Sequence, residues 1–229
     1  MAITLGTYAF QDGRTAAAEE YEEIGGRDAR RVQIKGVLED VASLDALEEE
    51  LDALLKAASE QGEHTALSLR TGRRLWVRRT GFSRELMPEA LAARFTLDLE
   101  AQDPYEEAEE ATVVPWTVTV WGDMKALDTS GNVWAPLVIT LVATGTLVDP
   151  AFSDGVRTIT YAGDVADGET LVFNGAARKV LLGDEDVTPY VTGLFPRIDP
   201  GGGTLTYTDD PADSPHTASV TVTHQARWW

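Results

Sequence analysis

The first part of the chain alternates polar and apolar residues and then changes to helical spacing. Residues 31–38 alternate as far as Gly36, which predicts a half-buried strand. Apolar side chains then recur every three or four residues, at Leu44, Leu47, Leu51, Leu54, Leu55 and Ala58. This spacing predicts a helix that has Ser43 as its N-cap and ends near Gly62.

More strand patterns follow the helix. Residues 66–69 and 75–77 flank Thr71-Gly72-Arg73 and predict a hairpin, and residues 93–99 alternate with Phe95, Leu97 and Leu99 on one side. The order strand, helix, strand, strand, strand predicts an α+β unit in which the helix covers one face of the sheet.

The second part has no helical spacing and consists of short strand patterns separated by Gly, Pro, Asp and Asn. These patterns cover residues 116–121, 137–142, 156–161, 170–173, 179–182, 204–207 and 219–225. Such a series predicts a β-sandwich. The Asn174-Gly175 pair predicts a tight hairpin, because both central residues of that turn adopt positive φ.

Charge divides the chain at about the same place as the pattern does. Residues 1–110 hold 13 basic and 24 acidic residues, whereas residues 111–229 hold 6 and 14. We therefore expect two domains, residues 1–110 and 111–229. The acidic run from Glu106 to Glu110, followed by Pro115, is interpreted as a solvated connector, with an exposed loop inside a single domain as the alternative.

Bulk composition excludes several classes of function. The 229 residues carry a net charge of −19, which argues against general affinity for nucleic acid or anionic membranes. With no cysteine, thiol chemistry, disulfides and Cys-based zinc sites are excluded. No apolar run is long enough for a membrane span, and the first residues lack the pattern of a signal peptide, so synthesis in a cytoplasm is expected.

Candidate catalytic chemistry is sparse. The three histidines are His64, His216 and His224, no serine lies in a Gly-x-Ser-x-Gly motif, and His224 is expected to be packed or at an interface. The clusters 184–186 and 209–213 offer oxygen ligands for calcium without EF-hand spacing, and turns are rich in Asp in any case. We expect no enzyme, no cofactor and no metal site.

The strongest local anomaly is a strip of basic residues free of acids, which we call the arginine strip: Arg70, Arg73, Arg74, Arg78, Arg79 and Arg84. Trp76 and Phe82 interleave it, as in nucleic-acid patches. We favour carboxylate partners, namely the helix face that contains Glu48, Glu49 and Asp52, in the same chain or in a neighbouring copy. A solvated strip without partners is the remaining alternative.

The C-terminal pair Trp228-Trp229 is also a candidate for subunit contacts. Two large aromatic side chains are costly to leave in water. We expect them to dock on the sandwich of their own chain or on an adjoining subunit.

As a whole, the chain resembles the distal tail (Dit) proteins of long-tailed bacteriophages. The resemblance covers nearly the full length, and the segments that carry it are residues 25–38, 80–84, 95–105, 131–141 and 168–175. It implies an α+β ring-forming (hexamerisation) domain with one long helix, followed by an all-β galectin-like sandwich. No catalytic residues are implied.

The resemblance also implies partners and a location. Dit proteins form a homo-hexameric ring that joins the major tail tube protein to the tail hub or tail-tip protein, close to the tape measure protein. The ring belongs to the virion and is made in the cytoplasm of the host bacterium. An acidic wall would let DNA pass without binding it. The alternative function is a carbohydrate-binding module for host-surface adhesion that uses Trp116, Trp121 and Trp134.

Overall fold

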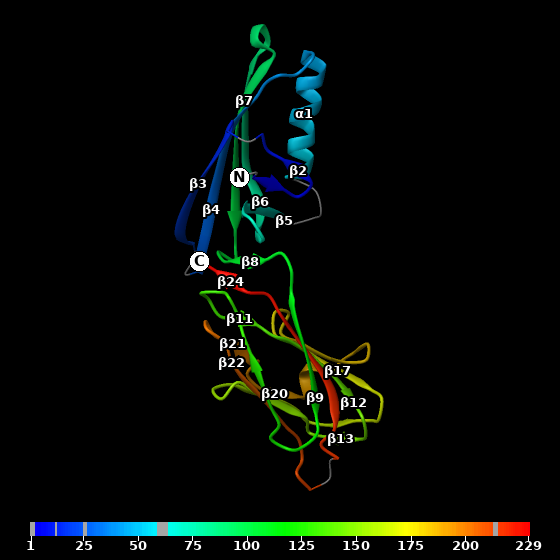
Figure 1. Ribbon diagram of the computed structural model, residues 1–229. Coiled ribbons are helices and arrows are strands. Elements are labelled where there is room, and N and C mark those ends of the chain that lie inside the picture. Colours follow the sequence, from blue (N-terminus) through cyan, green and yellow to red (C-terminus); the bar gives the residue numbers. More distant parts are fainter. Residues whose placement is uncertain (1–2, 12, 25–26, 59–63, 213–214) are drawn as a thin grey trace. The chain divides into compact units, whose positions relative to one another are not determined.

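The chain forms two compact units (Figure 1). The computed structural model describes residues 3–11, 13–24, 27–58, 64–212 and 215–229. The first unit comprises Met1–Glu109 together with Trp229, and the second comprises Glu110–Trp228. Most of the regular structure in both units is β-strand.

An antiparallel sheet with strand order β2-β1-β5-β6-β7-β4-β3 forms the first unit, and β8 also pairs with β6. Its strands are β1 (Thr4–Leu5), β2 (Tyr8–Ala9), β3 (Thr15–Ile24), β4 (Arg27–Leu38), β5 (Thr65–Arg70), β6 (Arg73–Met87), β7 (Ala92–Ala101) and β8 (Glu106–Ala108). The 3-10 turn η1 (Pro88–Ala90) connects β6 to β7.

Helix α1 (Leu44–Ala57) lies against this sheet and begins where the sequence predicts (Figure 1). The Ser43 hydroxyl accepts a hydrogen bond of 3.1 Å from the backbone N–H of Ala46, which satisfies one of the free amides of the first turn. Leu47, Leu51 and Leu54 are fully buried in the core of the unit. Gly62, expected to end the helix, lies outside the described residues.

The strands expected at residues 31–38, 66–69, 75–77 and 93–99 are confirmed, and most of them are longer than the patterns indicated. Two features differ from the expectation. The sequence patterns do not predict strands β1, β2 and β3, and the connector interpretation is wrong for residues 106–108, whereas Glu109 and Glu110 are exposed at the boundary between the units. Glu106–Ala108 forms β8, and the Glu106 side chain is buried.

Two antiparallel sheets form the second unit, one with order β10-β22-β14-β15-β20 and the other with order β19-β18-β17-β12-β23-β9. The strands are β9 (Thr112–Val118), β10 (Met124–Leu127), β12 (Val138–Ala143), β14 (Ala151–Ser153), β15 (Thr158–Tyr161), β17 (Thr170–Asn174), β18 (Lys179–Leu182), β19 (Glu185–Asp186), β20 (Val191–Gly193), β22 (Gly203–Thr208) and β23 (Ala218–His224). Shorter elements are β11 (Ala135–Pro136), β13 (Leu147–Val148), β16 (Asp164–Val165), η2 (Thr188–Tyr190), β21 (Arg197–Ile198) and β24 (Arg227–Trp228).

Both sheets of the second unit contribute to a single core, as expected of a sandwich. The Phe152 ring lies 5.5 Å from those of Phe173 and Tyr207, and 6.2 Å from that of Trp116, in edge-to-face geometry. All seven predicted strand segments contain a strand, although the first ends at Val118, before Trp121. The patterns do not predict strands β10, β14, β19 and β20, nor the short strands β11, β13, β16, β21 and β24.

The hairpin predicted at Asn174-Gly175 is present between β17 and β18, but its turn is longer than predicted. Asn174 pairs with Lys179, so four residues lie between the strands, and the Asn174 side chain accepts a hydrogen bond of 2.9 Å from the backbone N–H of Ala177. Arg178, with φ of 54°, adopts the left-handed conformation in place of Gly175. Gly175 is required for space, because a Cβ there would lie 2.8 Å from the Leu137 carbonyl oxygen.

Candidate functional site: the arginine strip and its carboxylates

The arginine strip begins at the turn of the β5–β6 hairpin. Gly72 occupies that turn with φ of 73°, a conformation that glycine adopts without strain, and Arg70 pairs with Arg73 across it. Strand β8 then lies beside β6 and brings its acidic residues close to the basic ones, with Arg74 opposite Glu107. Two segments of opposite charge are therefore neighbours in one sheet.

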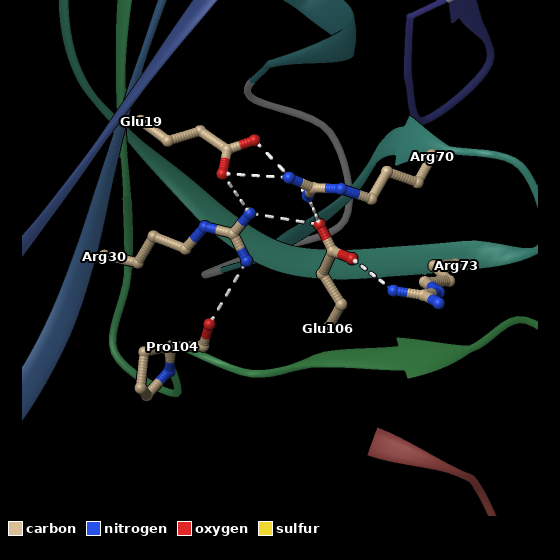
Figure 2. Close-up of polar contacts among 6 residues, drawn as sticks. All are labelled: Glu19, Arg30, Arg70, Arg73, Pro104 and Glu106. Atoms are coloured by element: carbon tan, nitrogen blue, oxygen red, sulfur yellow. Dashed lines mark hydrogen bonds and ion pairs between the residues drawn. The ribbon is translucent and has the colours of Figure 1, made fainter. Parts of the chain in front are cut away.

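A buried ion-pair network forms at this junction, as Figure 2 shows. Arg30 is fully buried, and Glu106 is 2% exposed. One terminal nitrogen of Arg30 lies 3.0 Å from Glu106 Oε1 and 2.5 Å from Glu19 Oε2, and the other donates to the Pro104 carbonyl oxygen at 3.3 Å. Arg70 donates to the Glu106 carboxylate as well.

Burial of these charges is tolerable because each one has several oppositely charged neighbours. Arg73 adds a further contact, 3.7 Å from Glu106 Oε2, so three guanidinium groups surround one carboxylate. For Arg70, burial lowers the pKa, but the charges of Glu106 and Glu19 outweigh it, so the pKa lies above its ordinary value. The network ties β3, β4, β5, β6 and β8 together.

The middle of the strip also has carboxylate partners in the same chain. Arg74 Nε donates to Glu107 Oε1 at 2.9 Å, and the indole N–H of Trp76 donates to the same oxygen at 2.6 Å. The Arg74 guanidinium also lies over the Trp76 ring, 4.9 Å from its centroid. Arg78 donates to Glu100 at 2.9 Å. Trp76 is thus occupied by the protein's own groups.

Arg79 and Arg84 differ from the rest of the strip. Both are exposed on β6, and within the described part of the chain neither forms an ion pair. Their charges remain available on the surface.

The carboxylates that the strip contacts are not those expected. Among the described residues, no ion pair joins the strip to Glu48, Glu49 or Asp52, which lie exposed on α1. The intrachain form of the predicted pairing is therefore wrong, because β8 occupies the edge beside the strip. Contact with the helix of a neighbouring copy stays a prediction.

One signal in the sequence points to the buried network. Arg30 has the same strand parity as Val32 and Ile34, so alternation places its charge on the buried side of β4. A charged residue in that position requires a partner. Glu106 could not be identified as that partner, because 76 residues separate the two.

Trp229 lies in the first unit, and so it does not dock on the sandwich of its own chain as one form of the prediction proposed. Its ring contacts Tyr105 and Tyr21, with centroids 4.8 and 5.7 Å apart. It remains 49% exposed. Trp228 is half-buried in the short strand β24.

The tryptophans, histidines and acidic clusters that the sequence offers for sugar binding, catalysis or metal binding do not form a common site among the described residues. Trp116 is buried in the sandwich core, so it is unavailable to stack on a sugar, and Trp121 donates its indole N–H to the Asp209 carbonyl oxygen. His224 is buried, and His216 Nδ1 lies 2.5 Å from Asp209 Oδ1.

In the described ranges, no group of three or more His, Asp or Glu side chains could hold a metal ion. Asp213 lies outside those ranges.

Comparison with solved structures finds a similar architecture in a phage protein. One solved structure that it matches is SPP1 Dit (gp 19.1), described as a paradigm of the hub adsorption apparatus in phages that infect Gram-positive bacteria. The match has a TM-score of 0.71 and 10% sequence identity, and it covers 100% of this chain and 99% of that one. The resemblance to distal tail proteins is thus confirmed at the level of the fold.

Other comparisons add little. No family model matches the chain, and no curated protein matches it. A structure of the infectious bursal disease virus VP2 subviral particle has a TM-score of 0.20 and 14% identity, over 98% of this chain and 56% of that one, which is too low to indicate a shared fold. Within the described residues, no helix is long and apolar enough to cross a membrane.

Proposed function

We propose that the protein is a structural component of a phage tail, a distal tail protein that forms a homo-oligomeric ring of about six copies. The observation that carries this proposal is the fold match to SPP1 Dit, which extends over 100% of this chain and 99% of the other. The match extends over residues of both units, which supports a common two-unit organisation. The ring would join the tail tube to the tail tip and leave a central passage for DNA.

Charge supports the same function. A net charge of −19 per copy would give an assembled ring a strongly negative surface, which repels the DNA backbone and prevents adhesion during passage. Arg79 and Arg84, which form no ion pair with the described residues, offer the opposite charge for contacts between copies, and the exposed acidic face of α1 offers matching carboxylates. Head-to-tail contacts between unlike patches close into rings when the rotation permits.

Electron microscopy of the purified protein tests the proposal most directly. We expect ring-shaped particles with a central hole, and a mass by light scattering of about six times 24.8 kDa. A protein that stays monomeric at every concentration and salt level would contradict ring formation. Rings whose bore is lined by the arginine strip would contradict the proposed passage for DNA.

A further inference from the structure

The second unit contains a pocket that is lined by three of its four arginines. Residues 111–229 hold four arginines among 14 acidic residues. Arg157, Arg178 and Arg197 line one cavity of about 350 Å³, together with Trp134. The fourth, Arg227, lies over the Trp134 ring, 5.4 Å from its centroid. In an acidic domain, this distribution gives the cavity basic walls.

Two of these arginines, Arg157 and Arg197, are held in place by hydrogen bonds to aspartates. Asp154 accepts hydrogen bonds from the backbone N–H groups of Val156, Arg157 and Arg197 and from the Arg157 side chain, at 2.7 to 3.0 Å. Burial raises the pKa of Asp154, but these bonds outweigh it and hold the pKa below its ordinary value. Arg197 Nε donates to Asp199 at 2.8 Å. The terminal nitrogens of Arg197 have no hydrogen-bond partner within the described part of the chain.

Arg178 has its entire guanidinium available. It is exposed at the end of the β17–β18 turn, and among the described residues it forms no ion pair. The hydrogen bond from the Ala177 N–H to the Asn174 side chain fixes the turn that precedes Arg178. The backbone that carries Arg178 is therefore held in place within the turn. A planar guanidinium with a free edge is suited to a carboxylate or another planar oxyanion.

The lining of the pocket selects the kind of ligand. Its side chains are Trp134, Pro136, Arg157, Arg178, Leu194, Phe195, Pro196 and Arg197, beside Gly175 and Gly193. Every polar side chain in this set donates hydrogen bonds, and none accepts. Neutral sugars need both, and the Trp134 ring already has the Arg197 guanidinium 5.0 Å from its centroid. These side chains therefore fit a ligand group that only accepts, such as a carboxylate.

A sheet edge and an exposed apolar side chain adjoin the basic walls. Strand β20 is the edge strand of its sheet and leads directly into the pocket at Gly193. Leu194 follows and is 65% exposed, with Phe195 half-buried beside it. An unpaired strand edge offers main-chain hydrogen bonds to an extended peptide.

We propose that this pocket binds an extended acidic segment of a different protein chain. A carboxylate of the segment would lie between Arg178 and Arg197, its backbone would pair with β20, and a neighbouring apolar side chain would contact Leu194. The inference uses residues of the second unit alone, so it stands or falls separately from ring formation.

The test uses the full-length protein and a synthetic peptide, acetyl-Ser-Leu-Asp-Leu-Glu-Ser-amide. Isothermal titration calorimetry measures affinity, and methyl NMR of Val191 and Leu194 reports the location. We expect saturable shifts at both methyl groups, and loss of binding when Asn and Gln replace the acidic residues of the peptide. R178Q should weaken binding roughly tenfold, because a charge-assisted hydrogen bond is lost. L194S should weaken it severalfold.

K179Q is the matched control, because it removes the same charge one residue away and outside the pocket lining. We expect it to change the affinity less than about twofold. Equal binding of the amide peptide, or an unchanged affinity in R178Q, would overturn the proposal. So would saturable binding of trigalacturonate at these methyl groups without the peptide, which would indicate an acidic glycan. Methyl shifts that depend on protein concentration alone would indicate a second copy as the occupant.

Discussion

Glu106 lies where water is excluded, and its charge is stabilised by Arg30, Arg70 and Arg73. Removing it would leave the fully buried Arg30 with Glu19 alone as a charged partner among the described residues. We therefore expect E106Q to reduce the free energy of unfolding by about 3 kcal/mol, since breaking a buried pair leaves an uncompensated charge. Urea denaturation followed by tryptophan fluorescence measures this change.

The neighbouring carboxylate is a suitable control. Glu107 contacts Arg74 and Trp76 at a more accessible site, with 21% of its side chain exposed. E107Q should cost about 1 kcal/mol or less, because pairs near the surface contribute little. Equal destabilisation by both substitutions would show that burial at residue 106 does not set the cost.

His224 makes the stability of the second unit sensitive to acid. It is buried on β23, and neither ring nitrogen has a hydrogen-bond partner among the described residues. Burial lowers its pKa, so the unfolded chain binds a proton more readily than the folded one. The contribution of neutral His224 to the free energy of unfolding should therefore be fully present above about pH 6.5, the pKa of an unperturbed histidine. It should decline as the pH falls below that value.

Replacing His224 tests this dependence. We expect H224L to raise the free energy of unfolding by about 1 kcal/mol near pH 6, since an unsatisfied buried polar group is removed. It should also reduce the loss of stability between pH 7.5 and 5.5, measured by thermal unfolding at several pH values. H64L, a substitution in the first unit, should not change the loss of stability between pH 7.5 and 5.5. A loss that is unchanged in H224L would rule out His224 as its source.

At the scale of elements, α1 shows what a local signal can predict. Its N-cap, its buried leucines and its acidic first turn are all encoded within a few residues of one another. S43A should lower the free energy of unfolding by about 1 kcal/mol, because the hydrogen bond to the Ala46 amide is lost. S43D keeps an acceptor at the cap and should have nearly the stability of the parent protein. Calorimetric unfolding distinguishes the two, and equal losses would show that the cap bond is not responsible.

Strands β3 and β8 show where local signals fail. The segment Thr15–Ile24 is rich in Ala and Glu, which favour helices, yet it forms a strand because β4 pairs with it along its whole length. Residues 106–108 are acidic enough to predict a solvated segment, but arginines far away in sequence surround Glu106. In both cases long-range pairing overrides the local propensity, and a single sequence does not reveal the pairing.

The same limit applies to the pocket of the second unit. The arginines at positions 157, 178 and 197 are isolated in sequence and form no motif. The hairpin turn after β17 and the Asp154 loop bring them to one cavity. In contrast, the sequence reveals the arginine strip because its members are close together, but it does not reveal the carboxylates that pair with them.

For the whole molecule, the distribution of charge determines how copies could meet. Arg79 and Arg84 lack ion-pair partners among the described residues, while the acidic face of α1 is exposed. If these surfaces meet in the ring, R79E/R84E places like charges together, which costs several kcal/mol per contact and raises the dissociation constant more than tenfold. Light scattering at 0.15 M salt should then show smaller species than the parent protein forms.

A compensating substitution makes this prediction specific. Adding E48R/E49R/D52R to R79E/R84E restores opposite charges and should restore the ring, whereas K125E/K179E, a double charge reversal in the second unit, should leave assembly unchanged. Higher salt should weaken the parent ring, because exposed charges are screened within about 8 Å at physiological ionic strength. Assembly of R79E/R84E with the parent's mass and salt dependence would exclude the strip as the contact, and any ring would then have to form through another surface.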